Sequence, residues 1–286
     1  MSNAMNIGLC AQVACIWEAT ARKPGNVHRF RDFRDTSYVD FLVSAAAMAP
    51  TLDRARGRRV GETVLDAVRA TRSVAATNTN MGIVLLFAPL AAVPEDRDLR
   101  SGIADVLEKV DVADARLVYE AIRLASPAGL GQVPEQDLTQ EPTVGLREAM
   151  VLAADRDLVA RQYASGFQEV LYDGVQALER GLGPSLEQAI VLCHLEFMAK
   201  YPDSLIVRKR GLAEAEESCR RARHVLDLGW PHPGASQTAI ADLDSWLRAE
   251  GNSRNPGTTA DLVAASLFAV LREGIIKLPA TWEPFK

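Results

Sequence analysis

The sequence of 286 residues has an ordinary composition, with 48% hydrophobic residues, 24% charged residues and a formal net charge of −5. A chain of this length can bury a large core without disulfides or metals. The negative charge argues against a general nucleic-acid binder, which is normally basic. The longest apolar run, at 81–93, contains Pro89 and is shorter than the roughly 20 residues that span a bilayer. We therefore expect no nucleic-acid partner and no membrane partner.

Residues 1–4 resemble the remnant of an expression tag ahead of a native Met5, and we predict one domain over 5–286. The first helical stretch carries Gln12 and Glu18 and lacks a basic leader, so no signal peptide is expected. The four cysteines form no CxxC pair and show no disulfide-like spacing, which favours a reducing compartment. We expect a cytoplasmic protein. The oligomeric state is left open, with a homodimer as one option.

Apolar residues recur at helical spacing in almost every segment, and strand-like alternation is nearly absent. The predicted helical segments, in chain order, lie around 9–17, 41–48, 64–75, 81–93, 103–110, 117–124, 144–154, 159–178, 186–198, 213–226, 240–247 and 262–271. We predict an all-α fold, a single multi-helix bundle whose active site is built from helix ends and interhelical loops. The longest loop, 127–142, is rich in Gly, Pro and Gln. It is interpreted either as a lid or as a plain connection.

Two polar stretches in the first third of the chain stand beside apolar helices. The sequence ARKPGNVHRF at 21–30 places Lys23 and Asn26 in a Pro-Gly loop, where an ammonium group and free backbone N–H groups can bind phosphate. Asp35 follows, either as a functional acid or as part of a helix cap. The sequence ATNTNMG places Asn78, Thr79 and Asn80 before the most apolar run. This second stretch is interpreted either as a cap or as a set of hydrogen-bonding groups for a ribose or a base.

Two further polar stretches lie in the last third of the chain. In YPDSLIVRKRG at 201–211, Asp203 precedes three adjacent cations, Arg208, Lys209 and Arg210. These groups would suit a polyphosphate, with Asp203 as a base or a metal ligand, but a helix cap followed by a solvated charge run is the alternative. In NPGTTADL at 255–262, Asn255 and Asp261 surround a helix start, where an acid is favourable for electrostatic reasons alone.

Common nucleotide and metal motifs are missing from the sequence. It contains neither a GxxxxGK[ST] phosphate loop nor a GxGxxG fingerprint, and its four histidines lack HxxxH or HExxH spacing. Any nucleotide must therefore be bound by other means.

Taken in order, the polar stretches resemble the triphosphoribosyl-dephospho-CoA synthase family, the ATP:dephospho-CoA triphosphoribosyltransferases. The resemblance runs from about Glu18 to Phe268, and the family is all-helical. The matching pieces are Glu18, Lys23-Pro24-Gly25 with Val27, Asp35, Phe41 with Ser44-Ala45, Asn78-Thr79 with Gly82, Asp203-Ser204, and Pro256-Gly257 with Ala260-Asp261-Leu262.

The resemblance implies a transfer in which ATP gives its triphosphoribosyl group to the 2′-hydroxyl of 3′-dephospho-coenzyme A and adenine leaves. Such a site needs cations and Mg²⁺ for the triphosphate, a carboxylate near the reacting carbon and a proton donor for adenine. Asp203 is the first candidate for base and metal ligand, with Glu18 and Asp35 as further catalytic candidates. The candidate substrate-binding residues are Lys23, Asn26, Asn78, Thr79, Asn80, Arg208, Lys209, Arg210, Asn255 and Asp261.

The chain also departs from the family pattern at polar positions. His28 stands where the family commonly has an acid, Asn80-Met81 where it has His-Lys, and 208–211 where it is rich in glycine. One alternative is therefore a related ribosyl or phosphoribosyl transferase with another cofactor precursor, such as a pterin, as acceptor. Another alternative is a non-catalytic helical protein that binds a nucleotide or serves as a scaffold.

Overall fold

The computed structural model describes residues 6–125, 141–183, 185–232, 234–280 and 282. Over these residues the regular elements are all helices, and the one β-bridge, between His28 and Arg31, is isolated. The all-α prediction is thus confirmed. The first eight helices are α1 (Ile7–Thr20), α2 (Tyr38–Asp53), α3 (Val60–Arg72), α4 (Met81–Ala92), α5 (Leu99–Lys109), α6 (Val112–Ala125), α7 (Leu146–Ala153) and α8 (Leu158–Ser165).

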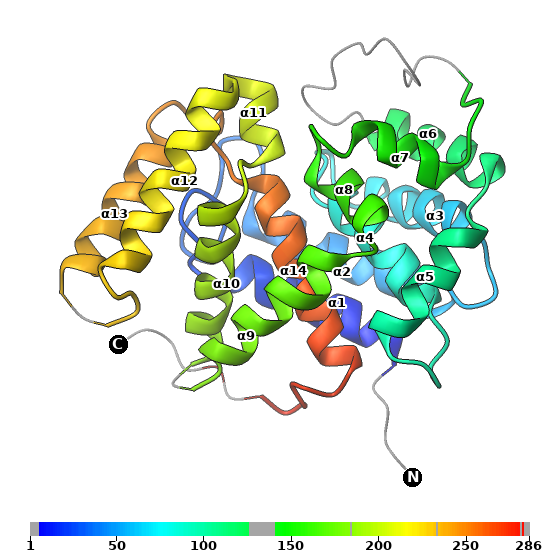
Figure 1. Cartoon of the computed structure of the whole chain (residues 1–286), viewed down its shortest axis with the longest axis horizontal. Coiled ribbons are helices and arrows are strands. Elements are labelled where there is room, and N and C mark those ends of the chain that lie inside the picture. Colours follow the sequence, from blue (N-terminus) through cyan, green and yellow to red (C-terminus); the bar gives the residue numbers. More distant parts are fainter. Residues whose placement is uncertain (1–5, 126–140, 184, 233, 281, 283–286) are drawn as a thin grey trace.

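The second part of the chain begins with a π-helical turn, which runs directly into an α-helix. Its elements are η1 (Glu169–Gly174), α9 (Val175–Gly181), α10 (Leu186–Lys200), α11 (Ser204–Arg210), α12 (Leu212–Asp227), α13 (Ala235–Arg248) and α14 (Gly257–Arg272). Figure 1 shows α3 to α8 on one side of α14 and α9 to α13 on the other. No helix within these described ranges is long and apolar enough to cross a membrane.

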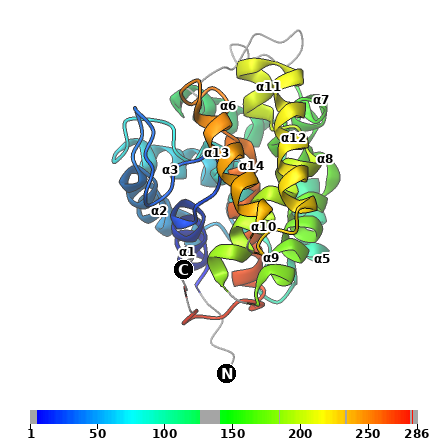
Figure 2. The same cartoon turned by 90° about the vertical axis from the view of Figure 1, so that its left-hand side faces the viewer.

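Helix α14 lies in the middle of the molecule, and it packs against α1, α4, α8, η1, α9, α10 and α11 (Figures 1 and 2). Its sequence is apolar on all sides, and every residue from Leu262 to Leu271 is buried. A helix without a polar face is stable only when neighbours cover it completely. Because α14 contacts so many helices, its N-terminal turns lie where the ends of several of them meet.

Helix α4 is the most apolar helix of the first part, as the run at 81–93 predicts, and it continues through Pro89. The Phe87 ring stacks on Phe268 of α14 with a centroid distance of 4.8 Å. Near the other end of the same contact, Gly82 of α4 faces Asp261 of α14. The pairing of α4 with α14 therefore joins a hydrophobic contact to a polar one.

Local helix signals agree with the structure in most places. Ser37 and Asp40 form a reciprocal capping box at the start of α2, so the cap uses Ser37 and leaves Asp35 outside it. Helix α2 includes Pro50 rather than ending before it. Ser185 caps α10 through the Gln188 N–H. Most of the predicted loop 127–142 lies outside the described residues.

The contact between η1 and α14 depends on a glycine. A Cβ atom at Gly174 would lie 1.9 Å from Ser266 Oγ and 2.8 Å from the Phe197 ring. The turn can approach α14 this closely only because residue 174 has no side chain.

We expect Gly174→Ala to lower the free energy of unfolding by about 1–3 kcal/mol, the usual effect of overpacking a core. Chemical denaturation would measure the loss. The matched control is Gly183→Ala, where an added Cβ meets nothing within 4 Å. Equal stability of the two variants would contradict this packing argument.

Candidate active site

Lys23 is fully buried and paired with Glu18. Its Nζ lies 2.9 Å from Glu18 Oε1, and it also donates to the backbone carbonyls of Glu18 and Ala21. The three protons of the ammonium group are therefore all used inside the protein. Burial lowers the pKa of Lys23 and raises the pKa of Glu18, while the charge of each partner opposes the shift of the other. In this structure Lys23 holds Glu18 in place and has no hydrogen left for a phosphate.

The loop that follows α1 is packed into the protein rather than lying on its surface. Gly25 has φ +76°, its N–H donates to Asp244 Oδ1 at 2.7 Å, and an added Cβ would lie 2.6 Å from Leu247. Arg248 donates to the Asn26 carbonyl at 2.5 Å. The Asn26 side chain accepts the Val27 N–H, so part of its hydrogen-bonding capacity supports the loop.

Asp203 is the N-cap of α11, and both of its oxygens are occupied. Oδ1 accepts from the N–H groups of Leu205 and Ile206 at 2.9 and 3.1 Å, and Oδ2 accepts from the N–H and hydroxyl of Thr259 at 2.7 and 2.8 Å. Burial raises the pKa of Asp203, and these four bonds oppose the shift. The carboxylate joins α11 to the first turn of α14, which is the capping role that the sequence left open.

Asp261 has a very different environment. An added Cβ at Gly82 would lie 2.1 Å from Asp261 Oδ2, so the carboxyl group lies directly against the backbone of α4. No hydrogen bond or ion pair joins this carboxyl group to another residue in the described part of the chain. The residue stays partly accessible to solvent. Burial raises the pKa of Asp261 well above its ordinary value, and nearby acids raise it further.

Three carboxyl groups from distant parts of the chain converge at the start of α14, and we call Glu18, Asp203 and Asp261 the acidic cluster. The charges of Glu18 and Asp203 both act on Asp261, as does Asp157, while Arg208 opposes them. Arg208 in turn pairs with Asp157 at 2.8 Å. The cluster thus has carboxyl groups inside and a cation at its edge.

The three polar residues predicted before α4 differ in exposure: one is exposed to solvent and two are buried. Asn78 is exposed and its side chain accepts the Met81 N–H. Thr79 is buried against Ser44 at 2.7 Å, and Asn80 donates to Thr71 Oγ1 and Met48 Sδ. These contacts position the start of α4 beside the acidic cluster. Of the three residues, only Asn78 is open to solvent.

The remaining candidates lie toward the surface near α11. Lys209 donates to the Asn252 carbonyl, and Asp35 accepts from the Asn252 side chain at 3.2 Å. Burial lowers the pKa of Lys209, and the charge of Asp35 acts against this shift. Arg210 pairs with Glu250 at 2.8 Å. Asn255 Oδ1 is buried without a hydrogen-bond partner in the described structure, which leaves an acceptor beside the start of α14.

The sequence argument missed several supporting residues. Asp157 caps α8 and also binds Arg208, and a cap signal alone could not show that second role. Glu187 is buried and pairs with Arg22 and Arg29 at 3.2 and 3.0 Å. These two arginines belong to the segment after α1, and no short motif links them to α10. Only the folded chain brings such partners together.

Mg²⁺ is implied by the family resemblance, and Asp203 does not fit the predicted role of its ligand. Both Asp203 oxygens already accept two hydrogen bonds each from the protein. No group of three or more His, Cys, Asp or Glu residues in the searched part of the chain is arranged to hold a metal ion. The side chains described here therefore form no metal site of their own.

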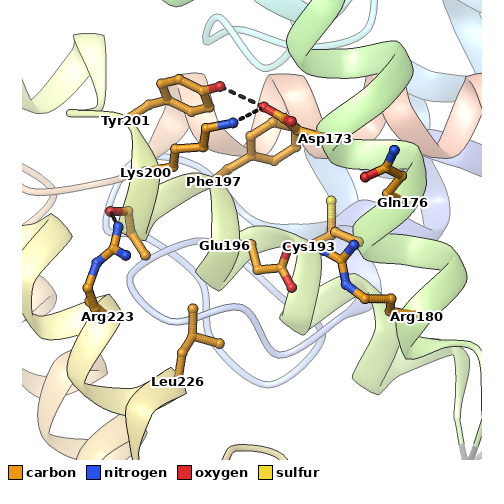
Figure 3. Close-up of a pocket in the computed structure, with 12 residues that line it drawn as sticks. Asp173, Gln176, Arg180, Cys193, Glu196, Phe197, Lys200, Tyr201, Arg223 and Leu226 are labelled. Atoms are coloured by element: carbon orange, nitrogen blue, oxygen red, sulfur yellow. Dashed lines mark hydrogen bonds and ion pairs between the residues drawn. The ribbon is translucent and has the colours of Figure 1, made fainter.

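A hollow of about 420 Å³ lies elsewhere, between η1, α9, α10 and α12 (Figure 3). Asp173 on its rim binds Lys200 at 2.5 Å and the Tyr201 hydroxyl at 2.6 Å. Arg180 pairs with Glu196 across it at 2.5 Å. None of the predicted site residues lines this hollow, and these charged groups are already paired with one another.

Comparison with known proteins finds two that bear the name of the predicted family. A solved structure from Archaeoglobus fulgidus, assigned as a triphosphoribosyl-dephospho-CoA synthase, is 28% identical with a TM-score of 0.63; the match covers 82% of this chain and 99% of that one. A protein of Pseudomonas savastanoi pv. phaseolicola, assigned as a 2-(5''-triphosphoribosyl)-3'-dephosphocoenzyme-A synthase, is 29% identical over 160 residues. That match covers 54% of this chain and 53% of the relative, so the chain spans about half the length of this curated relative.

Over the described residues the chain is thus an all-α protein in which several helix ends and polar side chains converge at the start of α14. The family of ATP:dephospho-CoA triphosphoribosyl transferases matches residues 4–278, and the chain belongs to this family. The predicted family is confirmed. The roles of the individual site residues stay predictions.

We expect Lys23→Met to lower the free energy of unfolding by about 3–5 kcal/mol, because Glu18 would remain buried without its counter-ion. Urea denaturation at neutral pH would measure this loss. The double variant Lys23→Met with Glu18→Gln removes both charges and should recover part of the stability. An unchanged midpoint in the single variant would contradict a structural role for this pair.

We expect Asp261→Asn to stabilise the protein, and increasingly so as pH rises. The pKa of Asp261 is raised in the folded state, whereas an unfolded Asp titrates near about 3.9. Between these two values the unfolded chain releases a proton that the folded protein keeps, so wild-type stability falls with rising pH. Asparagine cannot ionise. Thermal unfolding at about pH 5 and about pH 8 should show a Tm difference that widens with pH, and a constant difference would contradict the shift.

Proposed function

We propose that this protein transfers the triphosphoribosyl group of ATP to the 2′-hydroxyl of 3′-dephospho-coenzyme A and releases adenine. The observation that carries the proposal is the match of the transferase family over residues 4–278. The acidic cluster supports it, since transfer at a ribose carbon proceeds with positive charge that a nearby carboxylate stabilises. Such a reaction leaves the triphosphate intact, so the phosphates need binding groups rather than catalysts.

The proposed arrangement places the triphosphate toward α11. Arg208, Lys209 and Arg210 are exposed at the end of this helix, and Arg208 acts electrostatically on Asp261. Asn78 and Asn255 lie at the starts of α4 and α14 and offer hydrogen bonds to the sugar. Asp35 is exposed beside Lys209 and is the more accessible choice for a base. Mg²⁺ would enter with the triphosphate, as it commonly does at such sites.

Glu18 and Asp203 take different parts in this proposal. Glu18, whose charge Lys23 balances and whose own charge acts on Asp261, stabilises positive charge on the ribose. Asp203 is assigned the support of α11 and α14 in place of the catalytic role that its sequence context suggests, because four donors already bind it. The four cysteines show no disulfide-like spacing in the sequence, which favours a reducing compartment, and we also propose a cytoplasmic location.

Incubation with ATP, Mg²⁺ and dephospho-coenzyme A tests this function. We expect free adenine by liquid chromatography, together with an acceptor whose mass has grown by one triphosphoribosyl group. Omitting the acceptor is the control and should abolish adenine release. Adenine formed only with a pterin acceptor would favour the alternative transferase. Nucleotide binding without turnover would favour a scaffold, and pyrophosphate release from phosphoribosyl diphosphate would indicate another donor.

A further inference from the structure

We propose that Asp261 is the general acid of the transfer, giving its proton to adenine as the bond between ribose C1′ and adenine N9 breaks. This inference rests on the proposed function and deepens it. It assigns Asp261 a catalytic role instead of the supporting role that its sequence position suggests.

The geometry around Asp261 leaves its carboxyl group available. Its Oδ2 lies against Gly82, where a side chain of any size would displace it. It has no hydrogen-bond or ion-pair partner in the part of the chain that the structure describes. Asp203, the N-cap of α11, is bound by four donors, and Glu18 is bound by Lys23. Within the acidic cluster, Asp261 is thus the carboxyl group free to meet a substrate.

Burial raises the pKa of Asp261, and the acids that face it raise this pKa further. Glu18 on α1, Asp203 before α11 and Asp157 before α8 all raise its pKa, in addition to the larger effect of burial. Arg208 on α11 is the cation that lowers it. The Cys15 thiol on α1 also faces this group, and its own pKa is raised by burial and by the charges of Glu18 and Asp261. Two carboxyl groups with different environments are the usual way in which one site holds both an acid and a base.

Adenine needs this proton because it is a poor leaving group as an anion. In the proposed step, the electron pair of the C1′–N9 bond moves onto the base and a ring nitrogen takes the Asp261 proton, so neutral adenine leaves. The 2′-hydroxyl oxygen of the acceptor forms the new bond to C1′ and gives its proton to a second carboxylate. Partial exposure of Asp261 lets water return its proton before the next turnover.

The nearby histidines are poor alternatives for this role. Burial lowers the pKa of His28 to about 4 and that of His194 to about 3, with Lys23 acting in the same direction. Both rings are therefore neutral near pH 7 and have little tendency to act as proton carriers. His194 also bonds the Pro24 carbonyl through Nε2, which places that nitrogen in a structural contact.

The test compares two donors that differ in the need for a proton. ATP loses adenine, whereas nicotinamide riboside 5′-triphosphate loses nicotinamide, which leaves neutral without protonation. We expect Asp261→Asn to reduce turnover of ATP by about 10²–10⁴-fold, the usual contribution of a general acid. Turnover of the nicotinamide donor should fall by less than about tenfold. The matched control is Asp242→Asn, a change at an exposed position of α13, which should leave both rates unchanged.

The outcomes separate the two proposals. The first outcome concerns Asp261 alone. The wild-type protein releases adenine, but Asp261→Asn either keeps most of its ATP turnover or loses turnover of both donors to the same extent. This result would overturn the role of Asp261 and leave the proposed function standing. Wild-type protein that releases neither base would overturn the proposed function and this role with it. The pH profile is a second readout. The wild-type kcat/KM for ATP should fall at high pH, whereas the residual kcat/KM of Asp261→Asn should not. The same decrease at high pH in both proteins would contradict the proposal.

Discussion

The structure depends on one constraint: helix α14 is covered on all sides, yet it carries an acid near its N-terminus. The apolar residues from Leu262 to Leu271 require neighbours all around, and those neighbours bring the ends of α1, α4 and α11 together. Gly82 is what allows the acid to fit, because its missing side chain is the space that the Asp261 carboxyl group occupies. The contact between α4 and α14 therefore determines both the packing of the two helices and the position of the Asp261 carboxyl group.

Some polar groups around this contact support the fold, and others are left without partners among the residues that the structure describes. Lys23 and Asp203 use their hydrogen-bonding capacity within the protein: Lys23 holds the end of α1 and the Glu18 carboxylate, and Asp203 joins α11 to α14. Asp261 has no hydrogen-bond or ion-pair partner in the described part of the chain, and the cations of α11 are exposed, with Arg208 and Arg210 paired to acids at the surface. Supporting groups of this kind are what hold reacting groups in place in an enzyme. The site therefore combines a buried ion pair, Glu18 with Lys23, and a carboxyl group, Asp261, whose pKa is raised by burial; these are the two groups that the proposed transfer uses.

The sequence predicts the fold well, because long helices with a continuous apolar pattern leave little choice of structure. The buried run of α4 follows from the sequence pattern, and the resemblance singles out Glu18, Lys23, Asp203 and Asp261 as candidate site residues. Which of these residues support the fold and which stay available cannot be predicted from the sequence. Hydrogen bonds such as those from Thr259 to Asp203 join residues that are far apart in the sequence. Likewise, Asp157 reads as a plain helix cap until folding places it opposite Arg208.

The most direct measurement is a crystal structure of the wild-type protein with ATP and without acceptor. Our account predicts adenine with a ring nitrogen within about 3 Å of the Asp261 carboxyl group, the ribose beside Glu18, and the triphosphate directed toward α11. A nucleotide bound instead in the hollow between α9, α10 and α12, with Asp261 still against Gly82 and free of ligand, would contradict the account.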